Sequence, residues 1–191
     1  MNFITDDSLC CIDIIQIGNL DGMDNLVKLQ LDNNIITKIQ GLDKLTQLTW
    51  LDLSFNMIEK IEGLDKLIKL EDLSLYDNKI GCLEGLENLK NLNVLSVGKN
   101  QLEHLDKCVE YLADLHNNLE VLKIKGNLFK DSGDKDYKGR IISFLPHLKY
   151  LDYELIEDEQ RKTAVQDYRT ELDQRKNSVD VNQEKNENED Q

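Results

Sequence analysis

The sequence has 191 residues with 23 basic and 37 acidic side chains, giving a formal net charge of −14 at pH 7. This acidic balance argues against nucleic-acid binding, because neutralising phosphates requires clustered Lys and Arg side chains. No apolar run approaches the roughly 18 residues that a membrane-spanning helix needs. We therefore expect neither a nucleic acid nor a membrane as the partner.

The N-terminal residues 1–25 predict an incomplete structural unit, a degenerate coil or cap. The spacing of Ile14 and Ile17 matches the second half of the unit that follows, whereas the strand expected near residues 9–12 is degenerate. The chain begins with acidic residues where a secretory signal peptide carries basic ones. The four cysteines have no C-x-x-C spacing, so we expect a reducing, cytoplasmic compartment.

A nine-residue frame, L-x-x-L-x-L-x-x-N, recurs five times over residues 26–127. Its copies begin at Leu26, Leu48, Leu70, Leu92 and Leu119. Self-similarity at a period of about 22 residues is typical of leucine-rich repeats. The sequence therefore predicts an α/β solenoid of five leucine-rich repeats, with a curved parallel β-sheet on the concave face and short helical or 3-10 segments on the convex face.

Each copy of the frame ends in the same polar residue. These residues are Asn34, Asn56, Asn78, Asn100 and Asn127. At the end of a strand, where the chain turns inside the stack, an Asn amide can satisfy backbone groups that a Leu would leave unpaired. We therefore interpret the five asparagines as structural residues.

The segments after the fourth repeat depart from the regular spacing. The interval before the fifth repeat has five extra residues, which predict a longer convex helix built on Cys108, Leu112 and Leu115. Residues 128–156, with an amphipathic stretch at 137–144, are expected to form a C-terminal cap.

A charged helix is predicted over residues 157–176, and the acidic tail at 177–191 is expected to be disordered. An apolar stripe on this helix includes Val165, Tyr168 and Leu172. Such a stripe fits either the first turns of a coiled coil or a solvated helix that lies on the cap.

Side chains on the open face of the predicted sheet are the candidate binding residues. Strand side chains alternate, so residues at frame positions 3, 5 and 7 point away from the buried leucines. The candidates for protein binding are Trp50, Asp52, Asp72, Ser74, Tyr76, Lys123 and Lys125. Exposed aromatic residues flanked by charge are typical interface anchors, although Trp50 could instead pack laterally on a neighbouring strand.

The sequence gives no sign of catalysis. His104 and Cys108 stand four residues apart, but two candidate ligands do not form a metal site, and Cys108 falls on the core pattern. No phosphate-binding loop or matched nucleophile and base is present. We therefore expect a non-enzymatic protein without cofactor, metal or small-molecule substrate, whose partners are proteins.

Several segments resemble one family more closely than the repeat frame alone requires. They are LQLDNNI, WLDLSFN and LEDLSLYDN within residues 29–80, followed by VLSVGKNQL and LPHLKYLDYELIEDEQ. Over about residues 14–160 the sequence resembles the dynein regulatory complex subunit 3 family of the ciliary nexin-dynein linker. More broadly, the repeats are similar to a short intracellular class that includes a regulatory subunit of protein phosphatase 1.

The resemblance implies a scaffold of the ciliary or flagellar axoneme that binds regulatory-complex or dynein subunits and helps regulate dynein motility. The alternative is a regulatory subunit that holds a phosphatase catalytic subunit in its concave face. A third possibility is a repeat protein without a fixed partner. Members of the resembled family extend beyond both ends of this sequence, so a truncated paralogue or a soluble adaptor is also compatible with it.

Overall fold

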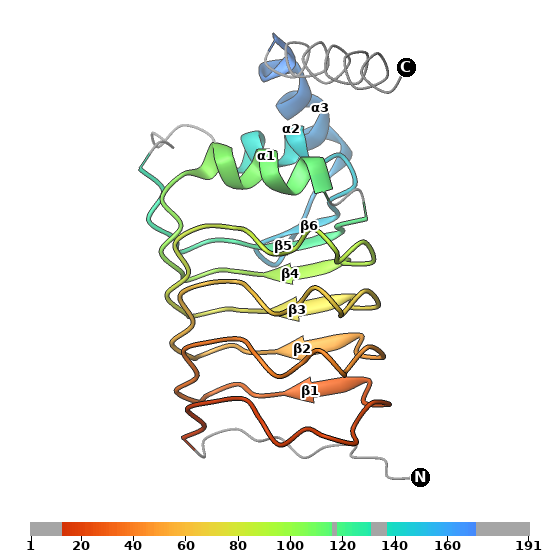
Figure 1. Ribbon diagram of the computed structural model, residues 1–191. Helices are drawn as coiled ribbons and strands as arrows, with labels where there is room; N and C mark the ends of the chain where they lie inside the picture. The colour runs from red at the N-terminus through yellow and green to blue at the C-terminus, as the bar shows by residue number, and fades with distance from the viewer. Residues whose placement is uncertain (1–12, 116–117, 131–136, 171–191) are drawn as a thin grey trace, which may run out of the picture.

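The computed structural model describes residues 13–115, 118–130 and 137–170, which form a single stack of coils (Figure 1). The strands are β1 (Lys28–Gln30), β2 (Trp50–Asp52), β3 (Asp72–Ser74), β4 (Val94–Ser96), β5 (Val121–Lys123), β6 (Tyr150–Leu151) and β7 (Glu154–Leu155). The helices in the described ranges are α1 (Leu105–Leu115), α2 (Tyr137–Phe144) and α3 (Asp158–Asp167). The strand expected near residues 9–12, any helix beyond residue 170 and the tail at 177–191 lie outside these ranges.

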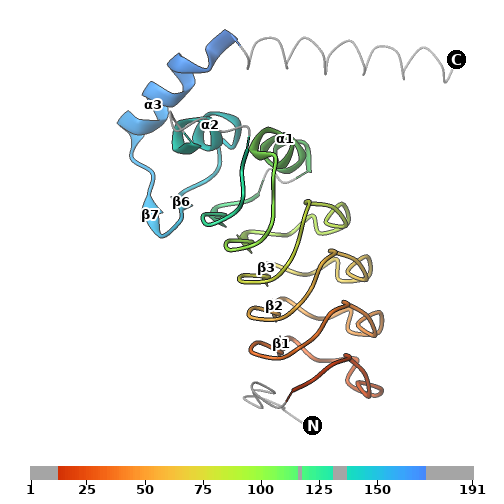
Figure 2. The same cartoon turned by 90° about the vertical axis from the view of Figure 1, so that its left-hand side faces the viewer.

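The strands form one sheet in chain order. Each strand from β1 to β5 pairs in parallel with the next, and β7 pairs antiparallel with β6. Equal frame positions face each other, so that Leu51 pairs with Leu29 on one side and Leu73 on the other. In Figure 2 the stack curves toward the side of β6 and β7, and α1 lies on the opposite side. The predicted leucine-rich repeat solenoid with a concave parallel sheet is confirmed.

The core runs through the whole stack as one continuous apolar column. The central residues of β2 to β5 are Leu51, Leu73, Leu95 and Leu122, and none has exposed surface. Burying each of these side chains contributes roughly 1.5–3 kcal/mol. Because every coil depends on its neighbours to cover its two flat sides, the stack is stabilised by contacts between coils.

An asparagine ladder joins the coils at the carboxyl ends of the strands. The Asn56 amide nitrogen donates to the carbonyl of Leu31 (2.9 Å) in the preceding coil and to that of Leu53 (3.1 Å) in its own. Its side-chain oxygen accepts the N–H of Ile36 (3.0 Å). Asn78 and Asn100 repeat this pattern one and two coils further along. Each buried Asn therefore links two coils through backbone groups that a leucine could not satisfy.

The convex side consists of tight turns, with a helix where the sequence is longer. In the first coil the N–H of Leu45 donates to Leu42 (2.9 Å), and that of Leu48 donates to Leu45 (3.0 Å), both spanning three residues as in a 3-10 turn. After the fourth strand the extra residues form α1, whose buried face includes the predicted Cys108 and Leu112.

Arg161 on α3 joins this helix to the rest of the cap. The Arg161 guanidinium on α3 donates to the carbonyls of Leu145 (3.4 Å) and Leu148, at the end of α2. This contact turns Ala164, only 3% exposed, toward the cap. Val165, a member of the predicted apolar stripe, is 42% exposed, and both alternatives for this helix stay predictions. The face of α3 that packs against the cap thus contains Arg161, which donates to carbonyls in and after the last turn of α2, and the buried Ala164.

Replacing one rung of the asparagine ladder should lower stability strongly. Asn78→Ala removes the amide N–H groups that donate to the buried carbonyls of Leu53 and Leu75. It also removes the oxygen that accepts the N–H of Ile58. We expect a loss of about 2–4 kcal/mol in unfolding free energy, measured by urea denaturation. The matched control is Asn88→Ala, the same change at an exposed position, which should be nearly neutral. Equal losses in both variants would contradict a structural role for the ladder.

Gly63 illustrates how closely the coils approach on the convex side. A Cβ at Gly63 would lie 2.8 Å from the Ile39 carbonyl oxygen of the preceding coil, and its φ of +69° disfavours other residues. Gly63→Ala should therefore cost about 1–3 kcal/mol in thermal or urea unfolding. At Gly81 a Cβ would meet nothing within 4 Å, so Gly81→Ala is the control and should not destabilise the fold.

Candidate protein-binding surface

The open side of the sheet brings five of the seven predicted binding residues together at β2 and β3. The central leucine of each strand is buried, while its neighbours at frame positions 3 and 5 are only partly buried. Strand register places Trp50 beside Asp72, and Asp52 beside Ser74. The concave face is defined here as the side chains at frame positions 3, 5 and 7 of all coils, and these four residues form its centre.

Trp50 is half-buried and lies beside Asp72 of the next strand in the register of the sheet. Both interpretations of Trp50, lateral packing and an interface anchor, stay predictions. Burial raises the pKa of the Asp72 carboxyl; Lys123 lowers that pKa, and the like charge of Asp52 raises it. In the described ranges neither Asp52 nor Asp72 forms an ion pair, so two neighbouring carboxylates remain available to an incoming cation.

Tyr76, at the carboxyl end of β3, lies between two residues that sequence reasoning did not select. The Phe55 ring meets the Tyr76 ring edge to face, with centroids 5.7 Å apart. On the other side, the Lys99 ammonium lies 5.2 Å from the centre of the Tyr76 ring. A Cβ at Gly98 would lie 3.0 Å from the Tyr76 ring, so the glycine makes room for it. Phe55, Tyr76 and Lys99 thus form a row across three successive coils.

Phe55 was missed because only frame positions 3, 5 and 7 were assigned to the open face, and Phe55 stands at position 8. The residues at this position all have left-handed backbones, with φ of 55° at Asn33, 54° at Phe55 and 55° at Asp77. That conformation costs an ordinary residue roughly 1–2 kcal/mol, and Asn, Asp and Gly tolerate it best. An aromatic residue at a position that favours Asn or Asp was therefore the available signal in the sequence.

Lys123 and Lys125 lie apart from the β2–β3 centre, toward the cap. The Lys123 ammonium lies 4.5 Å from the centre of the Tyr153 ring, another residue that sequence reasoning did not select, and Lys125 is exposed. The Asp152 carboxylate accepts the backbone N–H groups of Ile124 (2.8 Å) and Lys125 (3.0 Å). The basic end of the concave face is thus formed by the last repeat and the cap together.

Small side chains separate the two ends of the concave face. Ser96 is only 4% exposed, and the hydroxyl groups of Ser54 and Ser74 lie 2.6 Å apart in a hydrogen bond. With Gly98, these residues leave no large side chain on β4 that faces solvent at positions 5 and 7. A partner can therefore approach the backbone most closely between the acidic and basic ends.

Other features of the described ranges do not support chemistry or membrane insertion. A shallow groove of about 450 Å³ is lined only by polar or charged residues: Glu71, Asn91, Asn93, Asn118, Glu120, His147 and Lys149. Small-molecule sites are mainly apolar, so this groove does not resemble one. In these ranges no three His, Cys, Asp or Glu side chains, including those near His104 and Cys108, are grouped to hold a metal, and no helix is long and apolar enough to cross a membrane.

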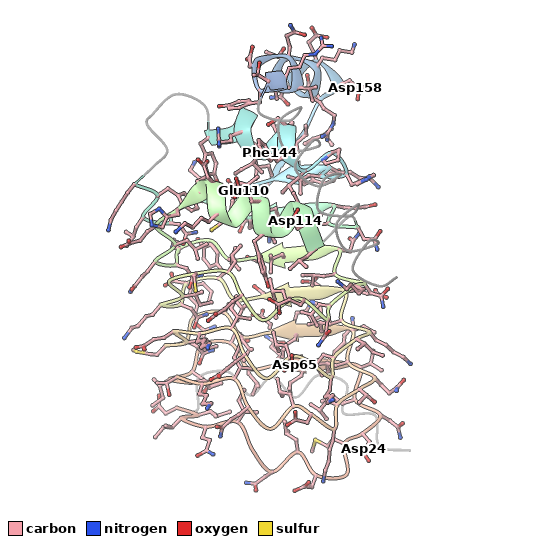
Figure 3. All side chains as sticks on the ribbon, turned by 45° about the horizontal axis from the view of Figure 1, so that its top comes forward. Asp24, Asp65, Glu110, Asp114, Phe144 and Asp158 are labelled. Carbon is pink, nitrogen blue, oxygen red and sulfur yellow. The ribbon has the colours of Figure 1, made fainter. Side chains whose placement is uncertain are left out.

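Acidic side chains outside the concave face are spread along the molecule. Figure 3 shows Asp24 near the first coil, Asp65 further along, Glu110 and Asp114 on α1, and Asp158 on α3. The negative charge is therefore not concentrated in one coil. On the concave face from β2 to the last repeat, by contrast, the charges are grouped, with Asp52 and Asp72 at one end and Lys123 and Lys125 at the other; Lys28 on β1 lies beyond the aspartates.

The raised pKa of Asp72 predicts a pH-dependent stability change. The folded protein binds the Asp72 proton more tightly than the unfolded chain does. At pH values above the ordinary pKa of 3.8, ionisation of Asp72 therefore disfavours folding. Asp72→Asn should therefore raise the melting temperature at pH 7, because the Asn side chain has nearly the same shape and carries no charge into the partly buried site. Near pH 3, below the unfolded value, the gain should vanish.

The control for this experiment is Asp43→Asn, which removes one exposed carboxylate outside the strands. Its melting temperature should follow the wild type at both pH values. A lower melting temperature for Asp72→Asn than for the wild type at pH 7 would contradict the destabilising effect of the buried charge.

Comparison with solved structures places similar solenoids in several organisms. The SNF/U2A′ complex of Drosophila melanogaster contains a chain 29% identical to this one, with a TM-score of 0.66, and the match covers 82% of this chain and 87% of that one. Internalin InlF of Listeria monocytogenes is 29% identical (TM-score 0.61), with 75% of this chain and 39% of that chain covered. Internalin C2 of the same organism is 28% identical (TM-score 0.62), with 75% and 58% covered.

The family assignment rests on a match to most of the sequence. A search of curated proteins gave no match. The family model for the leucine-rich repeat matches residues 29–179, well over half of the chain. The repeat frame, the parallel sheet in register and the asparagine ladder agree with that match. The chain belongs to the leucine-rich repeat family.

Proposed function

We propose that this protein is a non-catalytic scaffold that binds a partner protein through its concave face. The observation that carries the proposal is the surface at β2 and β3, where the half-buried Trp50 and Tyr76 flank Asp52 and Asp72, neither of which is ion-paired in the described ranges. Aromatic side chains beside charge dominate binding energy at many protein interfaces. The similar solenoid in the SNF/U2A′ complex supports a role in protein assembly.

We further propose that the partner belongs to the ciliary or flagellar axoneme, as a subunit of the dynein regulatory complex or of dynein. The support is the sequence resemblance of LQLDNNI, WLDLSFN and LEDLSLYDN, in successive repeats, to that complex's subunit 3. Trp50, Asp52, Asp72, Ser74 and Tyr76 all fall within the last two segments. In this proposal the protein is located in the cytoplasm and the axoneme.

A second candidate is a regulatory subunit that holds a phosphatase catalytic subunit. The charge difference along the concave face, acidic at Asp52 and Asp72 and basic at Lys123 and Lys125, is compatible with a globular enzyme of complementary surface. The two candidates differ in the solubility of the partner. An axonemal scaffold stays with salt-resistant cytoskeleton, whereas a phosphatase regulator co-purifies with a soluble enzyme.

A pull-down from ciliated-cell extract, with axonemal and soluble fractions kept apart, tests both candidates. We expect wild-type protein to recover regulatory-complex or dynein subunits from the axonemal fraction. The Trp50→Ala/Tyr76→Ala double variant should lose at least about 90% of that recovery, because truncating interface aromatics commonly costs 2 kcal/mol or more of binding free energy.

The control variant is Ile68→Ala, which removes an exposed apolar side chain (56% exposed) outside the strands. It should recover as much partner as the wild type. If the wild type recovers a soluble phosphatase catalytic subunit and the double variant does not, the second candidate is supported instead. Unchanged recovery in the double variant would contradict binding through the concave face.

A further inference from the structure

Two exposed aromatic residues occupy backbone positions that suit Asn or Gly. Phe55 has a φ of 54° with 45% of its surface exposed, and Tyr153 has a φ of 72° with 74% exposed. A bulky residue in the left-handed region is a conformational outlier. Because neither ring is buried in the core, packing does not account for the choice of an aromatic residue at either site. Strain maintained at an exposed side chain points to function.

Tyr153 is the stronger outlier of the two. It is the second central residue of the two-residue turn that joins β6 to β7, and Asp152 before it is also left-handed, with a φ of 48°. Hairpins of this type favour Asn-Gly or Asp-Gly, so a tyrosine stands where glycine is preferred. Phe55 likewise has a left-handed backbone at the frame position that Asn33, a residue suited to it, occupies in the first coil.

Both residues lie beside the concave face, near its opposite ends. Phe55 contacts the concave-face residue Tyr76, with ring centroids 5.7 Å apart, and Tyr153 contacts Lys123, whose ammonium lies 4.5 Å from the ring centre. From β2 to β6 the sheet makes four strand steps, which correspond to about 19 Å at roughly 4.8 Å each. Between Phe55 and Tyr153 the concave face includes the small side chains of Ser74 and Ser96, which leave room for an incoming segment.

Charge changes sign along the same path. Asp52 and Asp72 lie at the Phe55 end, and Lys123 and Lys125 lie at the Tyr153 end. In the described ranges none of the four forms an ion pair. A segment of uniform charge would be repelled at one end, so the complementary segment is basic where it meets the aspartates and acidic where it meets the lysines.

The backbone of the sheet determines the conformation of that segment. The strand N–H and C=O groups between β1 and β6 are already paired with neighbouring strands, as in the bond from Leu53 to Ser74 (2.8 Å). A segment lying across the strands must therefore satisfy its own backbone groups, as a helix does. A helix that spans about 19 Å has roughly 13 residues.

We propose that Phe55 and Tyr153 are the two anchors of a docking track for a helix of a partner protein. The helix has about 13 residues, apolar side chains that contact both aromatic rings, a basic group over Asp52 and Asp72, and an acidic group over Lys123 and Lys125. This inference rests on the proposed function and adds to it the location, length and charge order of the bound segment.

The first measurement separates binding from stability. Phe55→Asn and Tyr153→Gly each introduce the residue that the local backbone prefers, so both variants should have melting temperatures equal to or above the wild type. A fall of several degrees in both variants would show that the aromatic residues are retained for stability, and would overturn the proposal.

The second measurement uses a displayed library of random helical peptides about 16 residues long, somewhat longer than the 13 that span the track. Peptides enriched on the wild type should carry opposite charges at their two ends. The Phe55→Asn/Tyr153→Gly variant should bind them at least about tenfold more weakly. Ile68→Asn, at an exposed apolar residue outside the strands, is the control and should bind them as the wild type does.

A charge-reversed variant tests the order of charges. The Asp52→Lys/Asp72→Lys/Lys123→Asp/Lys125→Asp variant reverses both charges at each end, so it should enrich peptides whose two ends carry the opposite charge order, and an unchanged selection would overturn the proposal. The enriched peptides could also fail to bind Trp50→Ala and yet bind Phe55→Asn/Tyr153→Gly with wild-type affinity. That result would overturn the docking track and leave the concave face as the binding surface. If no substitution on the concave face weakens binding, the proposed function fails as well.

Discussion

The asparagine ladder is the interaction on which the rest of this structure depends. Each rung uses one side chain to bond backbone groups of two neighbouring coils, so the strands are held in register before any side chain on the open face is considered. The ladder bonds the buried backbone groups and the leucine column supplies the apolar burial. The fold therefore does not depend on the side chains of the concave face for its stability. Residues such as Trp50 and Asp72 can therefore carry a partly exposed ring and a carboxylate whose burial costs free energy.

Much of the fold could be predicted from sequence because the repeated leucines and asparagines make equivalent contacts in every copy of the frame. The convex helix α1 followed from extra residues with apolar spacing. The orientation of α3 could not be predicted, since it depends on Arg161 reaching the carbonyls at the end of α2, a contact between segments without a shared pattern. Apolar spacing selected Val165, which is 42% exposed, whereas it gave no indication that Ala164 is the buried residue of α3.

The candidate surface was predictable only in part, for a related reason. Strand alternation was enough to select Trp50, Asp52, Asp72, Ser74 and Tyr76 and to place them together. It could not select Phe55, Lys99 or Tyr153, because these residues follow strands, in turns where the alternation no longer applies. Their relation to the concave face depends on ring and ammonium positions across neighbouring coils, which the frame does not encode.

The constant register between coils also means that the number of coils sets the distance between the two ends of the concave face. Every strand from β2 to β5 meets its neighbour at the same frame position, so one whole coil could be added or removed without altering the pairing on either side. Such a change would move the two ends of the concave face apart or together by a fixed increment of roughly 4.8 Å. Related proteins could thus match partners of different lengths in discrete steps, with no redesign of the core.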